Sequence, residues 1–438
     1  MKDITTDRRS NLIKKNVGDL MREMFSSRIS EVISEIIRMA DEIGCKAYLV
    51  GGFVRDLLMK KPNRDVDIVI EGDGIKFAEL FARRVDGRVR THKRFKTSAV
   101  IFSDGFRVDV ATAREEYYAH PAALPVVEIS SIERDLYRRD FSINAMAICL
   151  NGKETSMLYD FFGGQSDLKD HVIRVLHKRS FIDDPTRVFR AVRFEHRLGF
   201  RICEPTLLLL ESATREKLFE KLSAERLFNE AVLILEEQKP EEALLRMNEL
   251  GLLKFIHPEL CFRVESNQLM NHCKETLVWF ELNFPGREVR RWVVMMMALF
   301  DSLANDCRDE MLQKFKSAKK MLSCPLVNLA KVEAATAKLH KPVVSPSFVG
   351  KAFENLTNEA LVFMAAKQTG EGIKALVTSY LTNIKDIRPF INGEDILKMG
   401  VSPSPIISNI LEQVMEAQLD GKLKSRHEAL KLADKLSR

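Results

Sequence analysis

The chain has 438 residues, of which 45% are hydrophobic and 30% are charged, and its formal net charge is +6. This composition is typical of a globular protein with sizeable cores, and the length favours about three domains. It excludes a membrane-spanning segment, because no apolar run approaches the roughly 20 residues that cross a bilayer.

Two further features indicate where the protein is expected to act. The basic N-terminus is followed by no apolar segment, so we expect no signal peptide. The seven cysteines include no C-x-x-C pair, which argues against a zinc site and a disulfide framework. Reduced thiols indicate a cytoplasmic protein. The mildly basic charge favours a polyanionic partner only slightly.

In chain order, a polar helical lead-in over residues 1–39 precedes a region in which strand-like and helical patterns alternate. Asp104 and Gly105 separate two of the strands and predict a hairpin. We therefore expect a small mixed sheet with helices packed on it. The predicted strands are residues 46–50, 65–70, 98–102 and 106–111.

From about residue 180 onward the strand-like alternation disappears, and helical patterns are punctuated by Pro and Gly. The predicted fold class is α+β, with a small mixed β-sheet in the N-terminal part and an all-α remainder.

Carboxylates interrupt the apolar run "DVDIVI". In a strand, Asp65 and Asp67 share one face, while Val66, Ile68 and Ile70 share the other. Asp109 repeats the pattern in the hairpin, so three carboxylates converge if the two strands are neighbours. Such hard oxygen ligands suit Mg²⁺, and two ions could activate a hydroxyl and stabilise a leaving pyrophosphate. Taken alone, the D-x-D pattern is common, and the solvent-exposed end of an ordinary strand explains it more simply.

The stretch "GGFVRDLL" lies between a predicted strand and a predicted helix. Gly51 and Gly52 would let backbone N–H groups approach phosphate oxygens, and Arg55 one turn later would add a charged contact. A plain Gly-Gly turn is the simpler explanation for the dipeptide alone. The nearby carboxylates on the next strand favour the phosphate site.

Two further motifs combine arginines with acids. In "SSIERDLYRRDFSINAMA", Ser130 followed by Glu133 predicts the start of a helix. In "DDPTRVFRAVRF", an aspartate can cap a helix that presents three arginines at a spacing of three residues. These could form ordinary surface pairs or offer hydrogen bonds to a nucleobase. The three arginines are Arg187, Arg190 and Arg193.

Together, "GGFVRD", "DVDIVI", "DLYRRDFSINAMA", "YDFFGGQSDLKDHVIR" and "DDPTRVFRAVRF" resemble, in order, the motifs of class II tRNA nucleotidyltransferases and bacterial poly(A) polymerases. The resemblance covers about residues 40–200. It implies an enzyme that adds nucleotides to an RNA 3′ end without a template. The implied domains are a lead-in (1–39), a catalytic head (40–155), a neck that recognises the base (156–255), a helical body (256–345) and a tRNA-binding helical tail (346–438).

The resemblance also implies roles for individual residues. Asp65 and Asp67 would hold Mg²⁺, two ions in all, with Asp109 as the third catalytic carboxylate. The other implied roles are triphosphate binding by Gly51, Gly52 and Arg55, a contact of Arg139 with the nucleotide's sugar or phosphate, base recognition by Asp184 and Arg187, and support from Arg190 and Arg193. The family's usual Glu-Asp pair is Asp183-Asp184 here, which leaves the role of Asp183 open.

Within the family, the chain is most similar to the A-adding enzymes, which attach the terminal AMP to tRNA ending in CC. Full CCA addition with CTP and ATP remains the alternative, since the 28-residue segment before Arg138 has the full length that CC-adding enzymes lack. The absence of a "GRRF"-type run argues against a poly(A) polymerase. A non-catalytic RNA-binding protein is less favoured, because all three carboxylates are present.

Overall fold

The computed structural model describes residues 12–438 except 118–124, 217, 316–317, 340–344 and 369–370. The start of the predicted lead-in and part of the 28-residue segment therefore lie outside the described residues. The chain divides into two compact units, Met1–Phe255 and Ile256–Arg438. The division falls where the sequence analysis ends the neck, and the finer domain boundaries stay predictions. In the described part of the chain, no helix is both long and apolar enough to cross a lipid bilayer.

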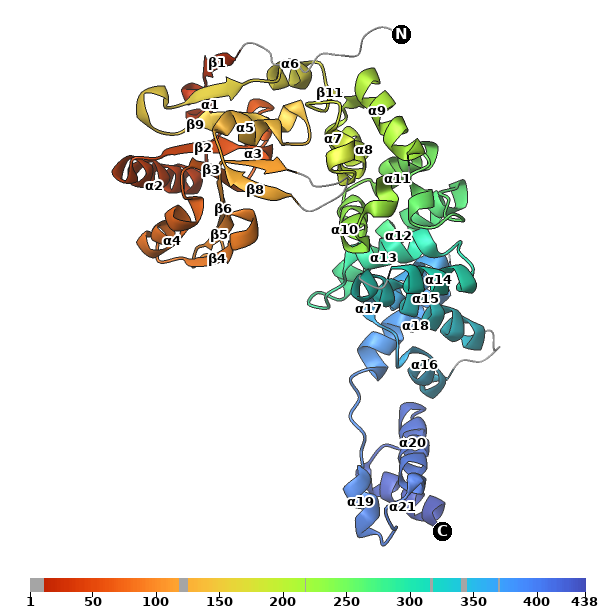
Figure 1. Cartoon of the computed structure of the whole chain (residues 1–438). Coiled ribbons are helices and arrows are strands. Elements are labelled where there is room, and N and C mark those ends of the chain that lie inside the picture. Colours follow the sequence, from red (N-terminus) through yellow and green to blue (C-terminus); the bar gives the residue numbers. More distant parts are fainter. Residues whose placement is uncertain (1–11, 118–124, 217, 316–317, 340–344, 369–370) are drawn as a thin grey trace. The chain divides into compact units, whose positions relative to one another are not determined.

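The first unit is built on an eight-stranded sheet in the order β1-β10-β9-β2-β3-β6-β5-β4 (Figure 1). Only β3 and β6 run parallel, and every other neighbouring pair is antiparallel. The strands are β1 (Ile13–Asn16), β2 (Lys46–Val50), β3 (Val66–Glu71), β4 (Arg88–His92), β5 (Thr97–Ile101), β6 (Arg107–Thr112), β9 (Met146–Cys149) and β10 (Met157–Asp160).

The predicted strands and the hairpin at Gly105 are confirmed, whereas β1, β4, β9 and β10 of this sheet were not predicted. Alternation explains the hairpin: Val100 and Val108 are fully buried and paired in register, and Gly105 adopts φ 82°, which glycine tolerates. β1 consists of exposed residues, so it carries no burial pattern that a sequence could reveal.

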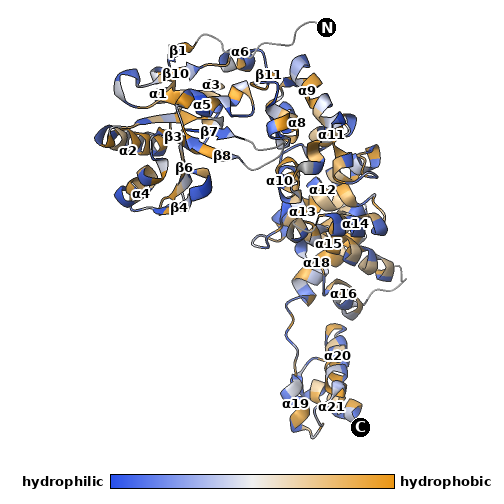
Figure 2. Cartoon of the chain, viewed as in Figure 1, coloured by the Kyte–Doolittle hydropathy of each residue, from blue (hydrophilic) through white to orange (hydrophobic). Residues whose placement is uncertain are grey.

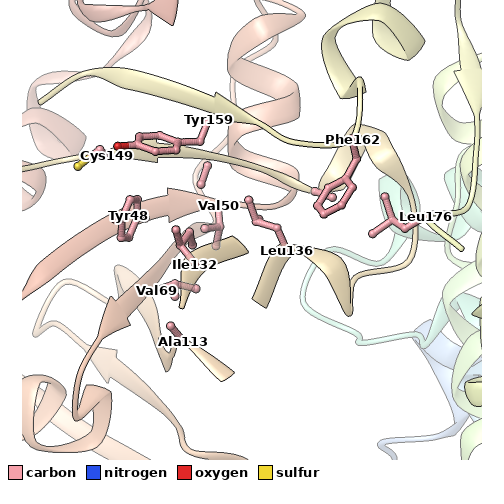
Figure 3. Packing of buried hydrophobic residues seen from close by; sticks show 12 residues of the cluster. Tyr48, Val50, Val69, Ala113, Ile132, Leu136, Cys149, Tyr159, Phe162 and Leu176 are labelled. Carbon is pink, nitrogen blue, oxygen red and sulfur yellow. The ribbon is translucent and has the colours of Figure 1, made fainter. Parts of the chain in front are cut away.

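The two faces of the sheet are covered differently. One face carries the helices α2 and α4, both strongly amphipathic; Asp73 caps α4 by accepting a hydrogen bond from the Lys76 amide at 3.0 Å. On the other face, an apolar cluster around Tyr48, Val69 and Leu136 packs beneath α5 (Figure 3). The helices of this part are α1 (Gly18–Met24), α2 (Ser27–Ile43), α3 (Gly52–Leu58), α4 (Gly74–Arg84), α5 (Ile132–Tyr137) and α6 (Gly164–Lys169).

The remainder of the first unit is mainly helical. A two-stranded ribbon, β7 (Arg114–Tyr117) with β8 (Val126–Ile129), leaves the sheet after β6. The prediction of helix alone after residue 180 is wrong at β12 (Arg201–Ile202), which pairs with β11 (Val172–Ile173). The helices are α7 (Ser180–Asp183), α8 (Thr186–Leu198), α9 (Glu204–Arg215), α10 (Ala224–Leu235) and α11 (Pro240–Glu249).

The second unit is helical in its described residues. α13 is apolar all round and is buried, and a separate small core forms where α19, α20 and α21 meet (Figure 2). The predicted α+β fold is confirmed. The helices are α12 (Val264–Asn283), α13 (Arg291–Phe300), α14 (Asn305–Lys314), α15 (Lys319–Leu339), α16 (Pro346–Phe353), α17 (Asn358–Lys367), α18 (Glu371–Ser379), α19 (Gly393–Lys398), α20 (Pro405–Leu419) and α21 (Arg426–Ser437).

Candidate active site

The parallel pairing of β3 with β6 brings the predicted carboxylates together. Asp67 lies directly opposite Asp109 in the register, and Asp65 stands exposed just before β3. The intervening apolar residues of both strands are buried on the helix-covered face, as predicted. The condition on which the sequence argument depended, that the two strands are neighbours, is therefore met.

The electrostatics of this cluster fit a cation. Burial raises the pKa of Asp67 to about 6; Arg139 opposes this rise, while the negative charges of Asp109 and Asp65 add to it. Arg107 donates to Asp109 Oδ1 at 2.6 Å and neutralises only part of the charge. Among the described residues no group of three acidic, His or Cys side chains is already arranged as a metal site. The carboxylate oxygens of Asp65, Asp67 and Asp109 are nevertheless hard donors of the kind that Mg²⁺ prefers, and a bound cation would relieve the repulsion between their negative charges.

Gly51 and Gly52 form the turn between β2 and α3. Gly51 adopts φ 69° and ψ −137°, and a Cβ built on it would lie 2.8 Å from Arg139 Nη1 and 3.6 Å from Asp67 Oδ2. The absence of a side chain therefore lets the turn, the arginine and the carboxylate meet. Arg55, one turn into α3, is only 3% exposed.

If Gly51 contacts the nucleotide, as the resemblance implies, replacing it by alanine should impair nucleotide binding more than RNA binding. The Cβ would be strained by the positive φ and would displace Arg139. We expect the KM for nucleoside triphosphate to rise about 10-fold or more, which corresponds to roughly 1.4 kcal/mol. Gly105→Ala, at another positive φ with open space around it, is the matched control for backbone strain alone. Equal effects in both variants would contradict the role of the close approach.

A buried polar chain links α3 to α8. Arg55 Nη1 donates to Asn144 Oδ1 at 2.8 Å, and Asn144 Nδ2 donates to Asp140 Oδ1 at 3.1 Å. Asp140 Oδ2 in turn accepts from Arg190 Nε at 2.9 Å and Nη2 at 2.5 Å. Burial alone would raise the pKa of Asp140, but Arg190 and Asn144 outweigh it and lower that pKa to about 2. The sequence analysis assigned neither Asn144 nor Asp140 to the site.

Asp135 orients two arginines at the site and was also missed. It is fully buried and accepts from Arg138 Nη2 at 2.7 Å and from Arg139 Nη2 at 3.1 Å. Arg138 Nη1 also donates to Glu116 on β7 at 3.1 Å. The i, i+3 and i, i+4 spacing of Asp135 with the two arginines was the available signal.

The predicted base-reading residues lie at the start of α8: Asp184 just precedes the helix and Arg187 is in its first turn. Asp184 Oδ1 accepts from the Thr186 amide at 3.0 Å, from Thr186 Oγ1 at 2.6 Å and from Arg226 Nη2 at 2.7 Å. Asp184, rather than its neighbour Asp183, thus hydrogen-bonds the start of the helix. Arg187 is buried and donates to Ser180 Oγ at 2.8 Å and to the Arg138 carbonyl at 2.6 Å.

Arg193, the last arginine of the series, lies deeper beside α10. It is 6% exposed and forms ion pairs with Glu230 at 3.7 Å and Glu237 at 3.5 Å. Burial lowers the pKa of its guanidinium. This position suits a supporting residue.

One cleft of about 920 Å³ in the first unit collects every residue that the sequence analysis singled out for the site, and also Asp140, Asn144, Arg226 and Glu230. The predicted residues that line it are Gly51, Gly52, Arg55, Asp65, Asp67, Asp109, Arg139, Asp184, Arg187, Arg190 and Arg193.

One local prediction needs correction. The helix α5 is capped by Ser131, not Ser130; Ser131 Oγ accepts from the Arg134 amide at 3.5 Å. Glu71 lies on the carboxylate face of β3 but serves a structural role. Its Oε1 accepts from the Ile132 amide at 2.7 Å, and it thereby fixes the start of α5.

Two family models match the chain. Residues 47–174 match the poly(A) polymerase head domain, and residues 199–262 match a probable RNA- and SrmB-binding site of polymerase A.

Individual relatives are similar over nearly the whole chain. An A-adding tRNA nucleotidyltransferase of Geobacter sulfurreducens is 38% identical over 97% of this chain, which spans only 49% of that relative. The A-adding enzyme of Halalkalibacterium halodurans is 32% identical over 95% of each chain. The structure of a CCA-adding enzyme in apo form II superposes with a TM-score of 0.77 at 38% identity, covering 96% of this chain and 98% of that one. Other solved CCA-adding enzymes hold ATP, CTP or tRNA.

Proposed function

This chain belongs to the family of class II tRNA nucleotidyltransferases and poly(A) polymerases, and we propose that it adds the terminal AMP to the 3′ end of tRNA that stops at CC, using ATP. The observation that carries the proposal is the single cleft in which Asp67 and Asp109 lie together with Asp184 and Arg187. A reacting phosphate and a selected base would both fit there. Relatives named as A-adding enzymes, at 38% and 32% identity, support the nucleotide.

In this proposal Asp65 and Asp67 would hold divalent metal, with two Mg²⁺ ions expected, and Asp109 is the third catalytic carboxylate. Mg²⁺ bound there would assist deprotonation of the attacking 3′-hydroxyl and stabilise the departing pyrophosphate. The chain's own residues position the reactants. Backbone N–H groups in the first turn of α3, which begins at Gly52, would bind the triphosphate, and Arg139 adds a positive charge beside Asp67.

Asp184 and Arg187 select the base by hydrogen bonding to its Watson–Crick edge. The contacts with Thr186 and Arg226 all end on Oδ1 of Asp184, which fixes the carboxylate's orientation. Each terminal nitrogen of Arg187 has two N–H bonds and uses one of them in its contacts with Ser180 and Arg138. A fixed acceptor beside a fixed donor matches adenine and cytosine, which offer an amino group next to a ring nitrogen.

Replacing Asp184 by asparagine tests base selection with little change in shape. The amide keeps one oxygen for Thr186 and Arg226, but it replaces the second acceptor with a donor. We expect the preference for ATP over GTP and UTP to fall about 10- to 100-fold, or about 1–3 kcal/mol, with tRNA affinity unchanged. Nucleotide competition on CC-ended tRNA measures the preference, and Asp183→Asn is the neighbouring control. Unchanged selectivity would mean that the base is read elsewhere.

Full CCA addition is the second candidate, because the apo structure that is 38% identical comes from a CCA-adding enzyme. The two functions differ in the substrates they extend. The test supplies tRNAs that end before the CCA, after C and after CC, each with CTP, ATP or both. Extension of only the CC-ended tRNA, by ATP alone, supports A addition. Incorporation of CMP into the shorter tRNAs would contradict A addition and support CCA addition instead.

A further inference from the structure

The carboxylates lie on a sheet face of which only part is covered. The register places Asp67, Asp109, Ala99 and Arg90 in one row across β3, β6, β5 and β4. Residues that pair in register point to the same side of a sheet. Arg90 therefore shares the face of the catalytic carboxylates, three strands away, which is about 14 Å at the usual strand spacing.

Over β4, β5 and β6, the described residues leave this face exposed at its arginines, whereas Ala99 between them is buried. Across β2, β9 and β10 the same face is filled by the apolar cluster beneath α5 (Figure 3). Across β4 to β6, by contrast, the helix α4 packs on the opposite face, where Val100 and Val108 are fully buried. Arg107 and Arg90 on the open side are exposed. Among the described residues, the cleft thus continues into a surface with exposed arginines that reaches the last strand of the sheet.

Four exposed cations lie at the end of this surface, and we call them the basic edge: Arg88 and Arg90 on β4, and Lys93 and Arg94 in the 3₁₀ turn that follows. In the part of the chain that the structure describes, none of the four side chains forms an ion pair. Arg84 nearby, by contrast, pairs with Glu35 and Glu42. The turn also adjoins the cleft, because Phe95 belongs to its lining.

We propose that the basic edge binds backbone phosphates of the RNA strand whose 3′ end lies at Asp67. This inference rests on the proposed function and adds the path that the RNA takes away from the carboxylates. The triphosphate has its own cations in Arg55 and Arg139, so a separate row of unpaired cations about 14 Å away calls for a second, longer polyanion. Phosphate contacts of this kind position the strand without reading its sequence.

The competing explanation is that cations on an edge strand only prevent sheets from pairing. That explanation accounts for Arg88 and Arg90, which lie on the edge strand itself. It does not account for Lys93 and Arg94, which lie beyond the strand in the turn whose last residue, Phe95, lines the cleft. The two explanations also differ in what neutral substitutions should change.

The test uses the full chain with Arg88→Gln/Arg90→Gln and, separately, Lys93→Gln/Arg94→Gln. CC-ended tRNA is the probe, and its Kd is measured over a series of salt concentrations. Each double variant should bind tRNA about 10-fold more weakly, and the slope of log K against log salt should become shallower by about 1 to 2, since each phosphate contact contributes about 1. The KM for ATP should stay unchanged. Lys153→Gln/Lys169→Gln removes the same charge elsewhere on the first unit as the control.

Wild-type tRNA affinity and salt slope in both double variants would overturn the inference, and so would equal losses in the control. Self-association of the variants with normal tRNA binding would favour the edge-protection explanation instead. Thermal melting verifies that the variants fold, and single substitutions replace any double variant that does not. AMP addition by the wild type is measured separately, and its absence would count against the proposed function. The salt dependence of tRNA binding by the variants tests only the path of the RNA.

Discussion

Asp67→Ala should lower AMP incorporation by about 10³-fold or more, roughly 4 kcal/mol in the barrier, while tRNA binding changes less than about twofold. Asp67 lies opposite Asp109 in the cleft, so its removal opens the carboxylate cluster that is proposed to hold the metal. Single-turnover incorporation of labelled ATP into CC-ended tRNA measures the first quantity, and filter binding measures the second. Asp65→Ala should behave similarly.

The control comes from the same acidic stretch. Asp73 caps α4, and asparagine is an equally good capping residue, so Asp73→Asn should keep full activity. Comparable losses in Asp73→Asn and Asp67→Ala would show that the stretch matters for folding and not for chemistry. Wild-type turnover in Asp67→Ala would refute the assignment outright.

A stability measurement tests the same cluster without activity. Because the folded-state pKa of Asp67 is raised to about 6, its ionised form is disfavoured by folding. In EDTA, Asp67→Asn should therefore melt at a higher temperature than the wild type, and the difference should grow as the pH rises from 3.8 to about 6. Mg²⁺ should raise the melting temperature of the wild type but not that of the variant.

Asp140→Ala should destabilise the first unit by about 3–5 kcal/mol and raise the KM for ATP. The substitution leaves Arg190 without its buried partner and detaches Asn144, which holds Arg55. Because the folded-state pKa of Asp140 is lowered to about 2, its contribution is present above pH 3.8 and is lost as the pH falls through about 2.

The chain offers an internal control for this experiment. Both tryptophans, Trp279 and Trp292, lie in the second unit. Their fluorescence should report an unchanged urea transition, while circular dichroism shows earlier loss of structure. Asp170→Ala, which removes an exposed carboxylate, should leave both signals at wild-type values. Wild-type stability of Asp140→Ala would mean that Arg190 finds another partner.

The sequence predicts those parts of the site that depend on local patterns. The alternation of apolar and polar residues predicted that Asp65, Asp67 and Asp109 share one face of the sheet, and the Asp104-Gly105 pair predicted the hairpin that leads into β6. The positions of Arg187 and Asp184 came from the resemblance, and the structure brings both to the cleft. Their roles remain predictions.

The sequence could not predict the contacts that join distant segments. Asp140 and Arg190 are 50 residues apart, and no periodicity relates them. Glu71 shares a face with the carboxylates, but only the placement of α5 shows that it holds a helix amide. Arg226 reaches Asp184 from a different helix, α10. Such partners depend on tertiary packing, which overrides local preference.

The pairing of β1 with β10 has a consequence during synthesis. Ile13 pairs with Asp160, so β1 leaves the ribosome almost 150 residues before the strand with which it pairs. Until β10 has been made, β1 has no partner strand, and an unpaired strand edge can pair with another chain. The sequence of β1, "IKKN", is exposed and carries two lysines, which disfavour pairing with another chain before β10 is available.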